Sequence, residues 1–150
     1  MTGWRIGYAA ANKEIIAAMT KIHQYTIMFA PTMAQVAAIE ALKSGEASAN
    51  EMVEDYNRRR LVMVKGLNKI SLPCFEPKGA FYAFPSIKGT GMTSEEFAEK
   101  LLTEEKVAVV PGNAFGQCGE GYIRCCYATS LADIEEALSR MGRFVKKYKK

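Results

Sequence analysis

The chain has 150 residues, of which 49% are hydrophobic and 24% are charged, and its formal net charge at pH 7 is +4. These values are ordinary for a soluble globular protein, and the length suits one domain with a substantial core better than two complete ones. No apolar run approaches the roughly 20 residues of a membrane helix, and the mild charge gives little support to a nucleic-acid partner, so we expect neither.

The first segment, residues 1–10, has the two-residue period of a short strand. Its larger side chains, Trp4, Ile6 and Tyr8, alternate with small or polar residues. The pattern starts without a turn or a cap, so we expect an internal segment of a longer chain.

Two helices are predicted to follow this strand. Asn12 is placed to cap the first helix, whose apolar side chains recur at three- and four-residue spacing. Pro31 suits the start of the second helix. Residues 33–42 are apolar on nearly every face, so we expect this helix to be buried and to end at Gly45.

A third helix is predicted over residues 50–70 and connects two unequal parts. Its arginine run, 58–60, is interpreted as a solvated face. We expect residues 1–45 to be a remnant of a larger layer. Residues 46–150 are expected to form a compact α/β unit in which helices cover one face of a small mixed sheet.

The second half predicts short strands and two capped helices. The strands are expected at residues 81–84, 107–110 and 122–128. Thr93 and Glu96 have the spacing of a capping box, and Ser130 is placed to cap the last helix. The side chains expected to face the core from these helices are Phe97, Leu101, Ile134, Leu138, Met141 and Val145.

The cysteines and the basic C-terminus suggest no metal or redox chemistry. The four cysteines lack metal-site spacing and the only histidine is His23, so we expect no metal and free thiols in the cytoplasm; the cysteines are Cys74, Cys118, Cys125 and Cys126. The basic residues from Arg143 to Lys150 could contact an acidic partner, although a solvated helix end is the favoured interpretation.

Two arginines stand in contexts that suit anion binding. Arg5 lies between Gly3 and Gly7, which permit close backbone approach, and taken alone this context favours an ion pair at a strand edge. Arg124 is the lone arginine in the apolar stretch 122–128, where an unpaired charge is costly. Taken alone, this context favours an ion pair with a glutamate of the protein.

The arginine motifs also carry a family resemblance. Residues 1–8 resemble the segment that follows the cofactor lysine in fold-type-I aminotransferases of class I and II. Residues 78–82, 109–116 and 121–124 resemble the small-domain strand, the active-site loop and the carboxylate-binding strand of the same enzymes, in the same order. The resemblance covers essentially the whole chain.

The resemblance implies pyridoxal 5′-phosphate as the cofactor and assigns roles to five residues. Arg5 matches the arginine that binds the cofactor phosphate, and Arg124 matches the arginine that binds the α-carboxylate of the substrate. Phe115, Asn113 and Gly79 are expected to border the substrate pocket, with ordinary packing and turn formation as the alternative.

The implied function is an aminotransferase of amino acid metabolism, a cytoplasmic homodimer acting on an α-amino acid and a 2-oxo acid. The catalytic lysine is expected just before Met1, so we expect this chain alone to be inactive. Without partners for the apolar segment 33–42, the chain is also expected to self-associate. The alternatives are another pyridoxal-phosphate enzyme of the same fold, such as a carbon–sulfur lyase or a synthase, and a non-catalytic domain or assembly module.

Overall fold

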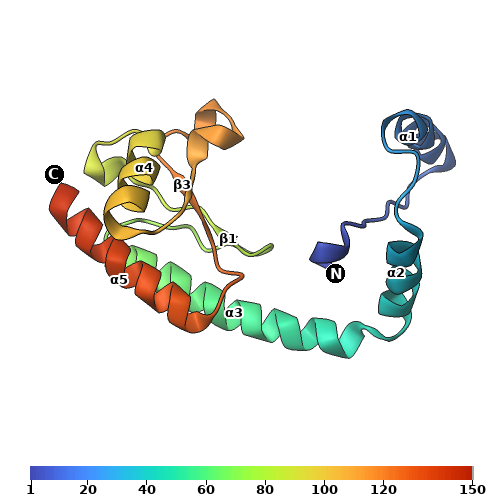
Figure 1. Ribbon diagram of the computed structural model, residues 1–150, viewed down its shortest axis with the longest axis horizontal. Coiled ribbons are helices and arrows are strands. Elements are labelled where there is room, and N and C mark those ends of the chain that lie inside the picture. The colour runs from blue at the N-terminus through green and yellow to red at the C-terminus, as the bar shows by residue number, and fades with distance from the viewer. Residues whose placement is uncertain (150) are drawn as a thin grey trace. The chain divides into compact units, whose positions relative to one another are not determined.

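A computed structural model of the chain describes residues 1–149, which divide into two compact units. The first unit is Met1–Glu51 and the second begins at Met52. Helix α3, Glu46–Lys69, starts in the first unit and continues in the second (Figure 1). Within residues 1–149, none of the helices has both the length and the apolar character needed to span a membrane.

The first unit contains the two predicted helices. Helix α1, Lys13–Thr26, begins where its cap was predicted, because the Asn12 side chain accepts a hydrogen bond from the Glu14 backbone N–H at 3.0 Å. Helix α2, Thr32–Ser44, follows Pro31 and ends at Gly45, as predicted.

The strand predicted for residues 1–10 is wrong. Thr2–Trp4 form a turn of 3-10 helix, η1, and residues 5–12 have no regular structure. Arg5 has a φ of 53°, a left-handed conformation that breaks an extended path. A strand needs a neighbour to pair its backbone groups, and within residues 1–149 no strand pairs with this segment.

The burial predicted for residues 33–42 is also wrong. Ala34 is the one buried residue described in α2, whereas Leu42 is 70% exposed and Met33, Val36 and Ile39 are exposed as well. The apolar composition favoured a helix, but Met1–Glu51 supplies too few neighbours to cover it.

The second unit contains a small sheet, which confirms the α/β class, although its described strands pair antiparallel and do not form the mixed sheet that was expected. Strands β1 (Tyr82–Ala83), β2 (Val110–Pro111) and β3 (Ile123–Cys126) are arranged in the order β1-β3-β2. The register pairs Tyr82 with Cys126 and Val110 with Arg124. Strands β1 and β3 are shorter than predicted, and β2 overlaps the predicted segment 107–110 only at Val110. Hydrogen bonds continue beyond the strand ends, as between the Tyr127 backbone N–H and the Phe81 carbonyl oxygen at 2.9 Å.

Three helices pack on one face of this sheet and enclose the core. Helices α4 (Ser94–Glu105) and α5 (Leu131–Tyr148) join α3, and Figure 1 shows α5 lying along α3. The predicted capping box of Thr93 and Glu96 and the predicted cap of Ser130 are both present. All of the helix side chains expected in the core are buried: Phe97, Leu101, Ile134, Leu138, Met141 and Val145.

Basic residues expected to be solvated form ion pairs, and Arg143 and Lys147 on the last helix remain 58% and 62% exposed, as expected of a solvated helix end. Arg60 is only 19% exposed and pairs with Glu76 at 2.5 Å, so the interpretation of the arginine run as a solvated face is wrong for this member. Arg143 pairs with Glu105 at 2.7 Å, and Lys147 with Glu104 at 2.8 Å. These two pairs join the end of α5 to the end of α4.

Candidate functional site

Arg124 lies on the sheet face opposite the helices, which we call the outer face. Its neighbours on β3, Ile123 and Cys125, are buried against the helices, and the strand period therefore turns Arg124 the other way. The Arg124 guanidinium carbon lies over the ring of Tyr82, 4.3 Å from its centroid, and over the ring of Phe115, 4.5 Å from its centroid.

The Arg124 guanidinium has no ionic partner among the residues that the structure describes. Among residues 1–149, no carboxylate lies within ion-pair distance of it, and no acceptor forms a hydrogen bond with its side chain. The glutamate partner considered as an alternative is therefore not found. A half-buried guanidinium with free N–H donors is suited to a ligand carboxylate, which can accept two of them.

Phe115 reaches Arg124 from η3, a turn of 3-10 helix at Gly112–Phe115. A Cβ atom on Gly112 would collide with the Gly119 carbonyl oxygen, so the close backbone approach that holds this turn requires glycine. Asn113 donates a hydrogen bond to the Glu95 carboxylate at 2.9 Å, and its Oδ1 atom is buried without a partner among the described residues. Asn113 thus ties η3 to α4.

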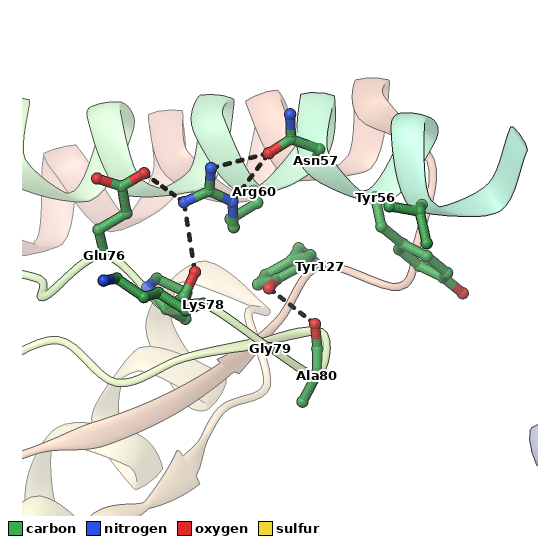
Figure 2. A pocket seen from close by; sticks show the side chains of 10 residues that line it. Tyr56, Asn57, Arg60, Glu76, Lys78, Gly79, Ala80 and Tyr127 are labelled. Atoms are coloured by element: carbon green, nitrogen blue, oxygen red, sulfur yellow. Dashed lines mark hydrogen bonds and ion pairs between the residues drawn. The ribbon is translucent and has the colours of Figure 1, made fainter. Parts of the chain in front are cut away.

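Gly79 lies at a separate cavity of about 460 Å³ between α3 and residues 76–80, which Arg124 does not line. Figure 2 shows Arg60 at this cavity. Its guanidinium donates to the Asn57 side chain, to Glu76 and to the Pro77 carbonyl oxygen. The structure therefore brings Phe115 to Arg124 but does not bring Gly79 there. Since the donors of Arg60 are engaged within the protein, this arginine joins the loop to the helix.

Ionisation at these positions follows from local contacts. Hydrogen bonding and attraction from Arg60 lower the pKa of the Glu76 carboxyl, which favours the ion pair. Burial raises the pKa of the Cys125 thiol to about 12, whereas Cys126 is exposed on the outer face. The two thiols point to opposite faces of β3, and the buried one is unreactive at neutral pH.

Arg5 lies in the first unit and is exposed to solvent. Its guanidinium makes one weak contact, a hydrogen bond of 3.4 Å to the Thr2 carbonyl oxygen, and pairs with no carboxylate among residues 1–149. No atom lies within 4 Å of a Cβ built on Gly3 or Gly7. The cation therefore has free donors and open space on both sides, which fits a phosphate group.

Tyr82 is a site residue that sequence reasoning missed. It stands opposite Cys126 in the β1–β3 register, and the strand period places it on the same face as Arg124. Phe84, two residues further along, stacks on Tyr122 with ring centroids 5.7 Å apart. The alternation of aromatic residues at 82 and 84 with a buried alanine was the available signal, but the register was needed to relate it to Arg124.

Comparison with known proteins gives consistent matches over nearly the whole chain. The family model of class I and II aminotransferases matches residues 1–141. The Bacillus subtilis (strain 168) protein YugH is 60% identical over 147 residues, which are 98% of this chain and 38% of YugH. The aspartate aminotransferase of Pyrococcus abyssi is 48% identical over 151 residues, covering 99% of this chain and 39% of that enzyme.

A solved structure agrees with these matches. The crystal structure of the aromatic aminotransferase from Pyrococcus horikoshii OT3 superimposes with a TM-score of 0.89 and 48% identity, covering 98% of this chain and 40% of that one. This chain therefore spans less than half the length of the relatives it matches.

Proposed function

This chain belongs to the family of class I and II aminotransferases, and we propose that the whole protein transfers an amino group between an α-amino acid and a 2-oxo acid. The observation that carries the proposal is the unpaired guanidinium of Arg124 over two aromatic rings. Both substrates of a transamination have a carboxylate next to the reacting carbon, so one arginine serves both half-reactions.

The proposed cofactor is pyridoxal 5′-phosphate, with Arg5 holding its phosphate. The free donors of Arg5 and the open space beside Gly3 and Gly7 support this assignment. When bound, the cofactor supplies an electron-withdrawing ring that stabilises negative charge at the substrate Cα.

The other residues are proposed to bind the substrate carboxylate or to shape the pocket around it. Arg124 binds the α-carboxylate and so fixes the orientation of the Cα atom, while Phe115 shields this contact from water. Asn113 borders the pocket by holding the turn that carries Phe115. Gly79 borders the separate cavity beside α3, so we assign it no role at the Arg124 pocket.

The proposal extends to the organisation of the whole protein. Residues 1–45 would belong to the large cofactor domain and residues 46–150 to the small domain. The whole enzyme would act in amino acid metabolism as a cytoplasmic homodimer. The exposed apolar side chains of α1 and α2 support further assembly, because such surface is normally covered.

The test of function uses the full-length protein with pyridoxal 5′-phosphate, a panel of amino acids and 2-oxoglutarate. We expect turnover that requires both an amino acid and a 2-oxo acid. Arg124→Lys should raise KM for both substrates by about 10- to 100-fold, because the second charge-assisted hydrogen bond is lost.

Arg58→Lys is the matched control, since Arg58 is a largely exposed arginine paired with Asp55 in the same unit. It should leave KM unchanged within twofold. Release of ammonia or a thiol without a 2-oxo acid would instead indicate a lyase. An unchanged KM in Arg124→Lys would remove the proposed role of this arginine.

A further inference from the structure

Two aromatic rings from different elements meet at Arg124. Tyr82 comes from β1 and is fixed by its pairing with Cys126, whereas Phe115 comes from η3, which follows β2. Their ring centroids lie 4.3 Å and 4.5 Å from the Arg124 guanidinium carbon. Rings from two segments of the chain thus meet at the one cation of β3.

Ring contacts hold a cation differently from carboxylate contacts. The face of an aromatic ring attracts the guanidinium through its quadrupole and accepts none of the N–H donors along the guanidinium edge. A carboxylate of the protein would use those donors and would have to be displaced before a substrate could bind. Because Arg124 has ring contacts but no ion pair among residues 1–149, its position is supported while its donors stay free.

The ring of Phe115 is itself supported. Although Phe115 is 49% exposed, it packs edge-on against Phe84 with centroids 6.1 Å apart. The hydrogen bond between Asn113 and Glu95 and the contact between Gly112 and Gly119 hold the turn from the other side. The ring is therefore attached to the body of the second unit through α4 and through Phe84, which directly follows β1.

We propose that Tyr82 and Phe115 are positioning residues that form an aromatic clamp on Arg124. The clamp holds the guanidinium with its N–H edge free, ready to bind a substrate carboxylate without rearrangement. This inference rests on the proposed function of Arg124. It adds that the two rings are what hold the guanidinium in its binding orientation. Arg124 binds the carboxylate that both substrates share. The clamp should therefore affect the binding of the amino acid and of the 2-oxo acid equally.

The kinetic test measures KM and kcat of the full-length enzyme for both substrates. Tyr82→Leu and Phe115→Leu should each raise both KM values about two- to fivefold, the fold-change expected from one cation–π contact, with kcat nearly unchanged. Tyr82→Phe keeps the ring and should restore the wild-type KM. Phe75→Leu, which removes a ring that is 81% exposed, is the matched control and should change nothing.

A double substitution tests whether the rings act through the arginine. In an Arg124→Lys background, Tyr82→Leu should raise KM less than it does in the wild type, because the clamped group is gone. Equal effects in both backgrounds would overturn the clamp. If Arg124→Lys raises KM but neither leucine variant does, the clamp is wrong and the role of Arg124 stands; if Arg124→Lys has no effect, the proposed function fails first.

A second readout needs no activity. In the ¹⁵N-labelled 150-residue chain, the Arg124 Nε–Hε signal, assigned by its loss in Arg124→Lys, should be shifted upfield by the two rings relative to that of exposed Arg58. The shift should shrink in Tyr82→Leu and persist in Tyr82→Phe. An Arg124 signal that matches Arg58, or that ignores Tyr82→Leu, would contradict the clamp even where a variant enzyme is too unstable to assay.

Discussion

Helices α1 and α5 begin in the same way and end up in different surroundings. Each has a polar cap, Asn12 for α1 and Ser130 for α5, that accepts a hydrogen bond from the first turn. Helix α5 buries Ile134, Leu138, Met141, Phe144 and Val145, whereas α1 buries none of its residues. Caps and periodicity therefore specify that a helix forms, and burial depends on what the rest of the unit places beside it.

The same contrast holds for the two units. The second unit closes a core around its sheet, while the first leaves most of its large apolar side chains in solvent. So many exposed large apolar side chains are uncommon on an isolated soluble domain and favour association with another surface. The stability of the described chain should therefore reside in the second unit.

The largest expected effect is on the free energy of unfolding, and it separates two isoleucines that both lie in capped helices. Ile134→Ala, at a side chain that is 1% exposed, should lower the free energy of unfolding by about 2–5 kcal/mol. Ile22→Ala, at a side chain that is 67% exposed, should change it by no more than about 0.5 kcal/mol. Urea titration followed by circular dichroism gives both values. Equal losses of unfolding free energy would contradict the difference between the two units.

The next effect concerns self-association through the first unit. Leu42→Lys replaces an exposed leucine of α2 and should raise the dissociation constant of self-association by at least about tenfold, because about 1.5–3 kcal/mol of apolar burial is lost. Gln24→Lys adds the same charge at an exposed polar position and serves as the control. Sedimentation velocity measures both, and a monomeric wild-type chain at high concentration would contradict this account.

Helix caps give a smaller effect that again separates the units. Thr93→Ala removes the capping box of α4 and should cost about 1 kcal/mol of global stability. Asn12→Ala should reduce the helix content of α1 without moving the main unfolding transition. Thermal unfolding monitored at 222 nm distinguishes the two, and a shared shift of the transition would show that the units unfold together.

The smallest effect is a pH dependence at the α4–α5 contact. Hydrogen bonds from Lys147 and Tyr148 lower the pKa of the Glu104 carboxyl from its ordinary value of 4.5. Its contribution to stability is therefore complete above pH 4.5 and is lost as the pH falls through the lower, folded-state pKa. Glu104→Gln should flatten the acid limb of the stability curve slightly, whereas Glu14→Gln in α1 should not.

Local features of this fold could be predicted from the sequence because they depend on adjacent residues. The caps at Asn12, Thr93 and Ser130 involve side chains and backbone groups at most three residues apart. The core stripe of α5 follows from helical spacing alone. Arg124 could be singled out because a charge among apolar residues is unusual wherever the strand lies.

Features that depend on distant partners could not be predicted in this way. The segment around Trp4 has the alternation of a strand but no neighbour to pair with. Arg60 is half-buried and paired because Glu76, 16 residues away, returns to it along the loop. The contact between Tyr82 and Arg124 depends on the register of β1 and β3, which a local pattern does not encode.

The most direct test of the central claim is a crystal structure of the full-length protein with a bound 2-oxo acid. We predict that the α-carboxylate accepts two hydrogen bonds from the Arg124 guanidinium, at about 2.7–2.9 Å, with the rings of Tyr82 and Phe115 still over its faces. A carboxylate bound by other residues, with Arg124 paired to a glutamate of the protein, would contradict the account.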